Sequence, residues 1–150
     1  MTPERLQVFL NDNIPMSVAM GAIIRHAGPD RLILDAPLAP NLNHHGTLFG
    51  GSGAALAILA AWSLVHVRLA DEGLVADLVI QRHAMEYEKP VAKAVTVEAM
   101  LLQEGAWPGF LRMLERKGRA RIAVLAVLLE EGEVRGRLSG EFVAMKKSEK

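Results

Sequence analysis

The segment 41–52 concentrates side chains that can move protons and bind oxygen atoms. It reads Asn-Leu-Asn-His-His-Gly-Thr-Leu-Phe-Gly-Gly-Ser and holds two amides, two imidazoles, two hydroxyls and three glycines. Imidazoles exchange protons near neutral pH, so His44 and His45 are candidates for acid–base catalysis. Asn43, directly before them, is a candidate to orient a water molecule. Together these residue types suit the activation of water for attack on a carbonyl group.

A helix is predicted to begin where this segment ends, near Gly50. The first turn of a helix leaves backbone N–H groups without intrahelical acceptors at the positive end of the helix dipole. Gly50 and Gly51 have no side chains that would keep a ligand away from this backbone. Such a helix start could bind a carbonyl oxygen and stabilise the oxyanion that forms when the carbonyl is attacked.

Structural roles for the same residues stay open. A Gly-Gly pair can serve only close packing of a helix on a sheet, and Ser52 suits an N-cap or first-turn position. Gly50–Gly53 does not match the Gly-x-Ser-x-Gly turn of serine hydrolases. The two histidines could be solvated loop residues. No His-Glu-x-x-His or other convincing metal spacing occurs, so no metal site is expected.

A second polar cluster lies in the predicted strand 75–88. Strict alternation along a strand places Asp77, Gln81 and His83 on one face. A charged side chain facing a buried helix is costly unless it has a purpose, so Asp77 is a further candidate base and His83 a candidate substrate contact. The alternative is that this face of the strand is simply solvated.

A third cluster is basic and is formed by Arg112, Arg116, Lys117, Arg119 and Arg121. It could meet the phosphates of coenzyme A or the acidic face of an acyl carrier protein, with Arg119 as a substrate-binding residue. The alternative is a solvated helix whose charges are balanced by residues such as Glu115.

The element that must position these groups is the predicted helix 50–72. Its apolar residues cover every side of the helix, so it is expected to be buried on every side over a length of about 35 Å. Strands predicted around one buried helix indicate an α+β fold, a single antiparallel sheet wrapped around a long central helix. The pattern predicts helices at 3–11 (with Thr2 as cap) and 109–117, strands at 18–27, 31–38, 75–88, 92–103, 119–131 and 134–145, and a frayed end at 146–150.

Length and composition narrow the function classes. The 150 residues suit a single domain over 1–150, and 17 Lys and Arg against 17 Asp and Glu argue against a nucleic-acid binder. The absence of cysteine excludes disulfides, zinc–thiolate sites and a cysteine nucleophile, and fits a cytoplasmic protein. The uncharged stretch 48–67 could be a membrane span, but its Ala and Gly content favours a buried core helix.

The run from Asn43 to Ser52, continuing into Ala60-Ala61-Trp62, resembles the hot-dog-fold thioesterases of the YiiD C-terminal-domain type. The stretches 76–80 and 87–91 also resemble that family, and the resemblance covers roughly residues 5–146. In some bacterial proteins this domain is fused to an acetyltransferase, for which the present chain is too short.

The resemblance implies an acyl-CoA or acyl carrier protein thioesterase of the hot-dog fold. It implies a homodimer, or a tetramer built from dimers, whose sheets join edge to edge with the active sites at the interface. The N–H groups of Gly50, Gly51 and Ser52 would bind the thioester carbonyl, and the loop 41–47 with Thr47 and Phe49 would line the pocket. No cofactor is implied beyond the coenzyme A or 4'-phosphopantetheine of the substrate.

The sequence departs from the family pattern in one respect. Many hot-dog thioesterases carry a carboxylate on the central helix, whereas here the first is Asp71, near its far end. The candidate bases are therefore His45, His44 and Asp77. Two alternatives remain: a non-catalytic protein that binds acyl thioesters, and an enoyl-thioester hydratase or dehydratase.

Overall fold

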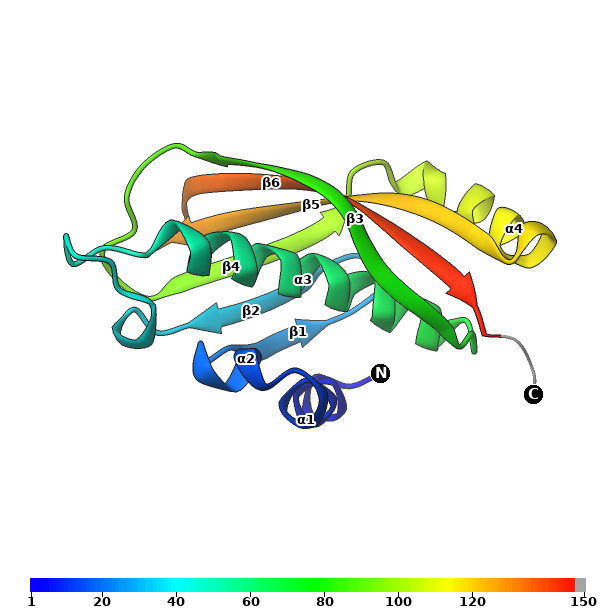
Figure 1. Cartoon of the computed structure of the whole chain (residues 1–150), viewed down its shortest axis with the longest axis horizontal. Helices are drawn as coiled ribbons and strands as arrows, with labels where there is room; N and C mark the ends of the chain where they lie inside the picture. The colour runs from blue at the N-terminus through cyan, green and yellow to red at the C-terminus, as the bar shows by residue number, and fades with distance from the viewer. Residues whose placement is uncertain (148–150) are drawn as a thin grey trace.

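The computed structural model describes residues 1–147, which form an antiparallel sheet wrapped around a long helix (Figure 1). The elements are α1 (Pro3–Asn13), α2 (Pro15–Ala19), β1 (Ile23–Ala27), β2 (Leu32–Ala36), α3 (Gly50–Asp71), β3 (Ala76–Tyr87), β4 (Val95–Leu101), α4 (Trp107–Lys117), β5 (Arg119–Glu130) and β6 (Glu133–Lys146), with 3-10 turns at Ala39–Asn41 and Glu104–Ala106. The strand order is β1-β2-β4-β5-β6-β3. The predicted hot-dog arrangement is confirmed.

Helix α3 forms the core because its buried side is almost entirely apolar, with Ser63 and Arg68 as the buried polar exceptions. Leu56, Leu64 and Val65 are completely buried, and the small side chains of Ala57 and Ala60 let the strands approach closely. The most apolar part of α3 is long enough to cross a membrane by composition alone, but 67% of that window is buried inside the fold. That burial identifies α3 as the core helix.

The N-terminal region differs in part from the prediction. Thr2 does cap α1, accepting a hydrogen bond from the N–H of Arg5. The strand predicted at 18–27 is wrong in its first half, because α2 occupies Pro15–Ala19 and β1 begins only at Ile23. Pro15 suits the first position of that helix, and the Ser17 hydroxyl donates to the carbonyl of Ile14 at 2.7 Å.

A bulge in β3 changes which residues share a face. Ile80 pairs with Phe142 of β6, but the next pair is Arg82 with Glu141, so Gln81 is an extra residue. Cross-strand partners lie on the same face of a sheet, so Ile80 and His83 face α3 whereas Asp77 and Arg82 face outward. The predicted grouping of Asp77, Gln81 and His83 on one face is therefore wrong.

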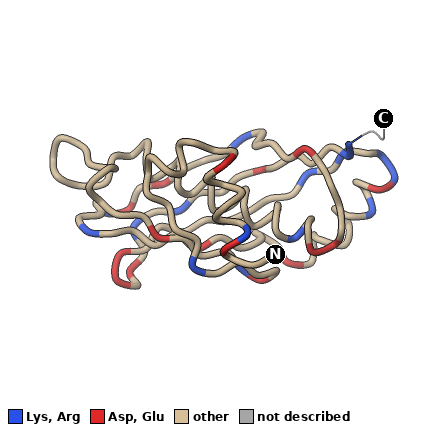
Figure 2. Tube along the Cα trace, turned by 90° about the horizontal axis from the view of Figure 1, so that it is seen from below, with Lys and Arg blue, Asp and Glu red and all other residues tan. Residues whose placement is uncertain are grey.

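The central and edge strands of the sheet have different surroundings. Strand β5 lies between β4 and β6 and is apolar on both faces from Ile122 to Leu129, as predicted for a central strand, whereas β3 is an edge strand with one side unpaired. The C-terminal end 146–150 was predicted to fray, but Lys146 is the last residue of β6, and 148–150 lie outside the described residues. Acidic and basic residues are spread over most of the described trace, but residues 36–67 carry none (Figure 2).

We expect Leu64→Ala to lower the free energy of unfolding by about 3 kcal/mol, because it leaves a cavity between α3 and the sheet. Leu102→Ala is the matched control: this leucine is 48% exposed, so its loss should cost less than about 1 kcal/mol. Urea denaturation measures both. Equal effects of the two changes would contradict the placement of α3 in the core.

Candidate functional site

A pocket of about 430 Å³ opens at the start of α3. We call it the helix-start pocket. It brings together four of the predicted site residues, which are Asn43, His45, Thr47 and Gly50. The other lining residues include the segment 87–91 and residues of β5 and β6. Its complete lining is Asn43, His45, Thr47, Leu48, Gly50, Tyr87, Glu88, Lys89, Pro90, Val91, Leu128 and Arg135.

Asn43 organises the loop that forms one wall of the helix-start pocket. Its side-chain oxygen accepts hydrogen bonds from the N–H of His45 at 2.9 Å and of Thr47 at 3.1 Å, and its Nδ2 donates to Thr47 Oγ1 at 2.9 Å. Gly46 closes the turn with a φ of 77°, a conformation that favours glycine. The geometry thus gives Asn43 a positioning role toward His45 and Thr47, and its role in orienting a water molecule stays a prediction.

The first turn of α3 presents unbonded donors. Phe49 occupies the N-cap position without a side-chain hydrogen bond, and its carbonyl accepts from the N–H of Gly53 at 3.0 Å. The N–H groups of Gly50, Gly51 and Ser52 have no acceptor among residues 1–147. These are the three donors that the family resemblance implies for a carbonyl oxygen.

Two aromatic side chains fix the position of this turn. The hydroxyl of Tyr87 donates to the carbonyl oxygen of Gly50 at 2.6 Å, which ties α3 to the end of β3. The ring of Phe49 lies against Gly51, where an added Cβ would come within 2.4 Å of Phe49 Cε1. A larger residue at position 51 would therefore displace this exposed ring. Sequence reasoning did not name Tyr87 as a site residue, although it begins the stretch 87–91 that resembles the family and lies at the end of a strand that faces α3.

The opposite wall of the pocket is a network of ion pairs. Arg135 contacts Glu130 at 2.7 Å and Glu133 at 3.1 Å, and Lys89 contacts Glu133 at 3.2 Å. The hydrogen bond from Lys89, with the charges of Arg135 and Lys89, lowers the pKa of the Glu133 carboxyl. Glu88 pairs with Arg137 at 3.0 Å. The wall is therefore nearly neutral despite its many charges.

Other predicted site residues are not gathered here. His44 does not line the pocket, although its ring centroid lies 3.8 Å from that of His45. Asp77 Oδ1 lies 3.5 Å from Lys147 Nζ. Asp77 comes ten residues before Tyr87, which corresponds to about 33 Å along the strand. Arg119 begins β5 opposite Met145, at the same distant end of the sheet. Within one chain, neither Asp77 nor Arg119 reaches the helix-start pocket.

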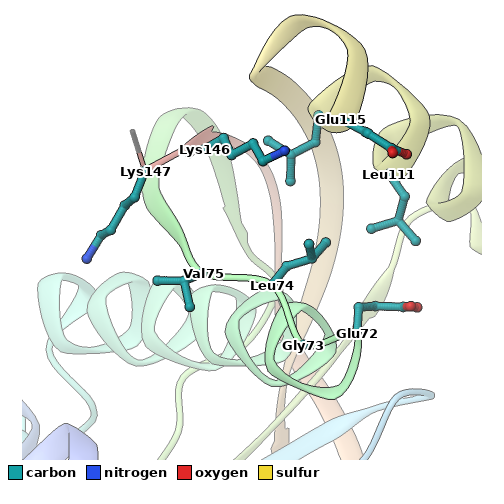
Figure 3. A pocket seen from close by; sticks show the side chains of 9 residues that line it. Glu72, Gly73, Leu74, Val75, Leu111, Glu115, Lys146 and Lys147 are labelled. Atoms are coloured by element: carbon teal, nitrogen blue, oxygen red, sulfur yellow. The ribbon is translucent and has the colours of Figure 1, made fainter. Parts of the chain in front are cut away.

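A larger pocket of about 600 Å³ lies at the opposite end of α3 (Figure 3). The turn Glu72–Val75 forms one side, Leu111 and Glu115 of α4 another, and Lys146 and Lys147 a third. It contains none of the predicted site residues. Nowhere in residues 1–147 do three His, Asp or Glu side chains form a group that could hold a metal ion.

Comparison with known proteins agrees with this geometry. Residues 3–146 match the model of a family described as "Putative thioesterase (yiiD_Cterm)". A protein of unknown function from Chlorobaculum tepidum TLS is 30% identical, with a TM-score of 0.89 over 97% of this chain and 98% of that one. A putative thioesterase from Shewanella oneidensis is 26% identical, with a TM-score of 0.85 over 95% and 96%. A probable thioesterase from Pseudomonas aeruginosa, at 19% identity, shares the fold with a TM-score of 0.84 over 98% of this chain and 97% of that one.

We expect Asn43→Ala to loosen the loop, because the N–H groups of His45 and Thr47 lose their acceptor. Amide hydrogen exchange at these two positions should accelerate by about tenfold, which corresponds to the loss of one hydrogen bond. His44→Ala removes an exposed side chain of the same loop and should leave the exchange rates nearly unchanged. Equal protection in both variants would contradict the positioning role of Asn43.

Proposed function

The chain belongs to the YiiD C-terminal family, and from that membership we propose that it hydrolyses acyl thioesters at the helix-start pocket. The observation that carries the proposal is the set of three unbonded N–H groups at the start of α3, the first of which belongs to Gly50 and lines the helix-start pocket together with His45. A thioester carbonyl placed there would accept hydrogen bonds that strengthen as negative charge develops on its oxygen. Gly53 and Leu56, which follow these donors along α3, are buried, so apolar core lies behind the donors.

His45 is the base that we propose for the reaction, since it alone of the three predicted bases lines the pocket. The imidazole takes a proton from water, and the water oxygen bonds to the carbonyl carbon. The tetrahedral oxyanion then re-forms the carbonyl as the C–S bond breaks. The imidazolium returns its proton to the thiolate, which gives a carboxylic acid and a free thiol. No cofactor takes part beyond the coenzyme A or phosphopantetheine that the substrate carries.

The basic residues of α4 and β5 support a phosphorylated or acidic carrier. Arg112, Arg116, Lys117, Arg119 and Arg121 line two shallow pockets on the outer face. None of the five forms an ion pair with another residue in the described part of the chain. Unpaired cations in a protein of zero net charge suit the phosphates of coenzyme A or the surface of an acyl carrier protein.

We place these cations near the pocket through a homodimer. The free side of β3 can accept an identical strand, and a two-fold axis makes that pairing antiparallel. The end of β3 that adjoins Arg119 in one copy would then lie beside the end that carries Tyr87 in the other. The dimer thus accounts for a charge cluster that is remote from the pocket within one chain.

A non-catalytic acyl-thioester binder is the second candidate, and one observation favours it. The first carboxylate on α3, Asp71, lies at the far end of the helix, where it accepts a hydrogen bond from the N-terminal amine of Met1 at 2.7 Å. No helix carboxylate therefore reaches the first turn of α3. Such a protein would use the same donors to hold the thioester without cleaving it.

We expect thiol release from acyl-CoAs of increasing chain length, followed with a thiol-reactive dye. His45→Ala should lower kcat by at least about tenfold because the base is lost. His26→Ala, a histidine on β1 outside the pocket, is the matched control and should retain the activity. If the folded wild-type protein releases no thiol but acyl-CoA raises its Tm, the binder replaces the thioesterase.

The double charge reversal Arg116→Glu/Arg119→Glu should raise KM by about fivefold and leave kcat nearly unchanged, because coenzyme A or the acyl carrier protein is held more weakly. The difference from wild type should shrink at high salt, which screens the interaction. Arg5→Glu on α1 is a charge reversal of half that size away from this cluster and should have no effect. An unchanged KM in the double variant would remove the cluster from substrate binding.

A further inference from the structure

A buried carboxylate lies behind the helix-start pocket without lining it. Glu130 is the last residue of β5, and its side chain is only 8% exposed. It does not belong to the lining of the pocket. The turn between β5 and β6 lies at the same end of the molecule as the first turn of α3 (Figure 1). A charge is rarely buried this deeply unless it is paired and hydrogen-bonded, so the partners of this carboxylate must account for its position.

Both oxygens of the Glu130 carboxylate have partners. Oε2 pairs with Nη2 of Arg135 at 2.7 Å, and Oε1 accepts a hydrogen bond from the backbone N–H of Ala92 at 2.8 Å. Ala92 comes 38 residues earlier in the chain, in the segment that connects β3 to β4. The carboxylate therefore joins the β5–β6 hairpin to a connecting segment that lies outside the strands.

A bulge in β6 brings Arg135 to this position. Strand β6 carries one residue more than β5 here, and the extra residue is Arg135, so its side chain is released from the regular alternation of the strand. Its carbonyl oxygen accepts hydrogen bonds from the N–H groups of Glu88 at 2.8 Å and Lys89 at 3.1 Å. Arg135 thus holds the beginning of the segment 88–92 through its backbone and the end of that segment through Glu130.

The segment 88–92 in turn contacts the chain just before α3. The carbonyl of Val91, a residue that is 3% exposed, accepts a hydrogen bond from the N–H of Leu48 at 2.8 Å. Leu48 directly precedes Phe49, the N-cap residue of α3. Oxyanion donors act at distances of about 2.7–3.1 Å from the oxygen, so a small shift at the start of the helix weakens them. Movement of Val91 would therefore reach the donors through Leu48.

We propose that Glu130 is a positioning residue for the N–H donors at the start of α3. The proposal rests on the thioesterase function proposed above and adds a residue to that site. The carboxylate fixes the Ala92 N–H, the adjoining Val91 carbonyl fixes Leu48, and Leu48 fixes the helix cap. Arg135 holds the carboxylate in the orientation that this path requires. Glu130 touches no substrate in this role, because it lies behind the lining of the pocket.

Glu130→Gln tests the path, because the amide has one oxygen where the carboxylate has two, so either Arg135 or the Ala92 N–H loses its acceptor. Arg135 keeps its ion pair with Glu133, so no buried cation is left without a partner and the variant should fold. Its kcat should fall by about tenfold while KM changes by less than about twofold, because misplaced donors stabilise the transition state less and bind the substrate about as well.

Glu131→Gln is the matched control on the same hairpin. Glu131 also reaches the connecting segment, through Lys93 at 2.8 Å, but this ion pair is exposed and should leave kcat within about twofold of the wild type. Glu130→Asp is the second variant if Glu130→Gln unfolds. Its side chain keeps the charge for Arg135 but is one methylene too short to bond to Ala92 as well, so it should show the same loss of kcat.

Amide hydrogen exchange of the substrate-free protein separates failure of this proposal from failure of the thioesterase. In Glu130→Gln, exchange should accelerate by about tenfold at Ala92 and by a smaller factor at Leu48, while the amides in the middle of β5 keep their rates. That result with a wild type that releases no thiol would sustain the positioning role and overturn the hydrolysis. Unchanged exchange at Leu48, an equal acceleration throughout the sheet, or an unchanged kcat in an active protein would each overturn the positioning role.

Discussion

The burial of α3 against the curved sheet is the constraint on which the rest of the structure depends. Because Leu56, Leu64 and Val65 must leave water, the strands bend around the helix, and alanines at the contact let them approach it. The helix can then end only at the margins of the sheet. Its unbonded N–H groups consequently emerge at a boundary where apolar core lies behind them and polar loop residues lie in front.

The donors at that boundary are held by long-range contacts. The Leu48 N–H bonds to the carbonyl of Val91 at 2.8 Å, and the Phe49 N–H bonds to Asn41 at 2.7 Å, so the loop is fixed from both sides before α3 begins. Tyr87 then ties the first carbonyl of α3 to the edge strand. These contacts join segments far apart in the sequence, and each of them orders the site in advance of any ligand.

Sequence reasoning succeeded where one physical pattern dominates. The all-round apolar character of 50–72 gave the core helix to within one residue of its observed end, and the polar run 41–47 gave the loop of the pocket. It failed at β3, because a single extra residue, Gln81, reverses the faces that alternation assigns without changing the composition. Tyr87 and Arg135 were not named as site residues for a different reason: their importance comes from partners about forty residues away or from neighbouring charges.

The bulge in β3 affects how readily identical chains can add to its unpaired edge. An unpaired strand edge is a template on which identical chains can add without limit. The extra residue at Gln81 twists the strand locally, and charged side chains such as Arg82 and Glu86 lie close by. Many strands cannot add to such an edge as a flat sheet, whereas one strand with the same twist can still pair with it. A twisted and charged edge of this kind disfavours open-ended addition of identical strands, which is the first step of fibrillar aggregation.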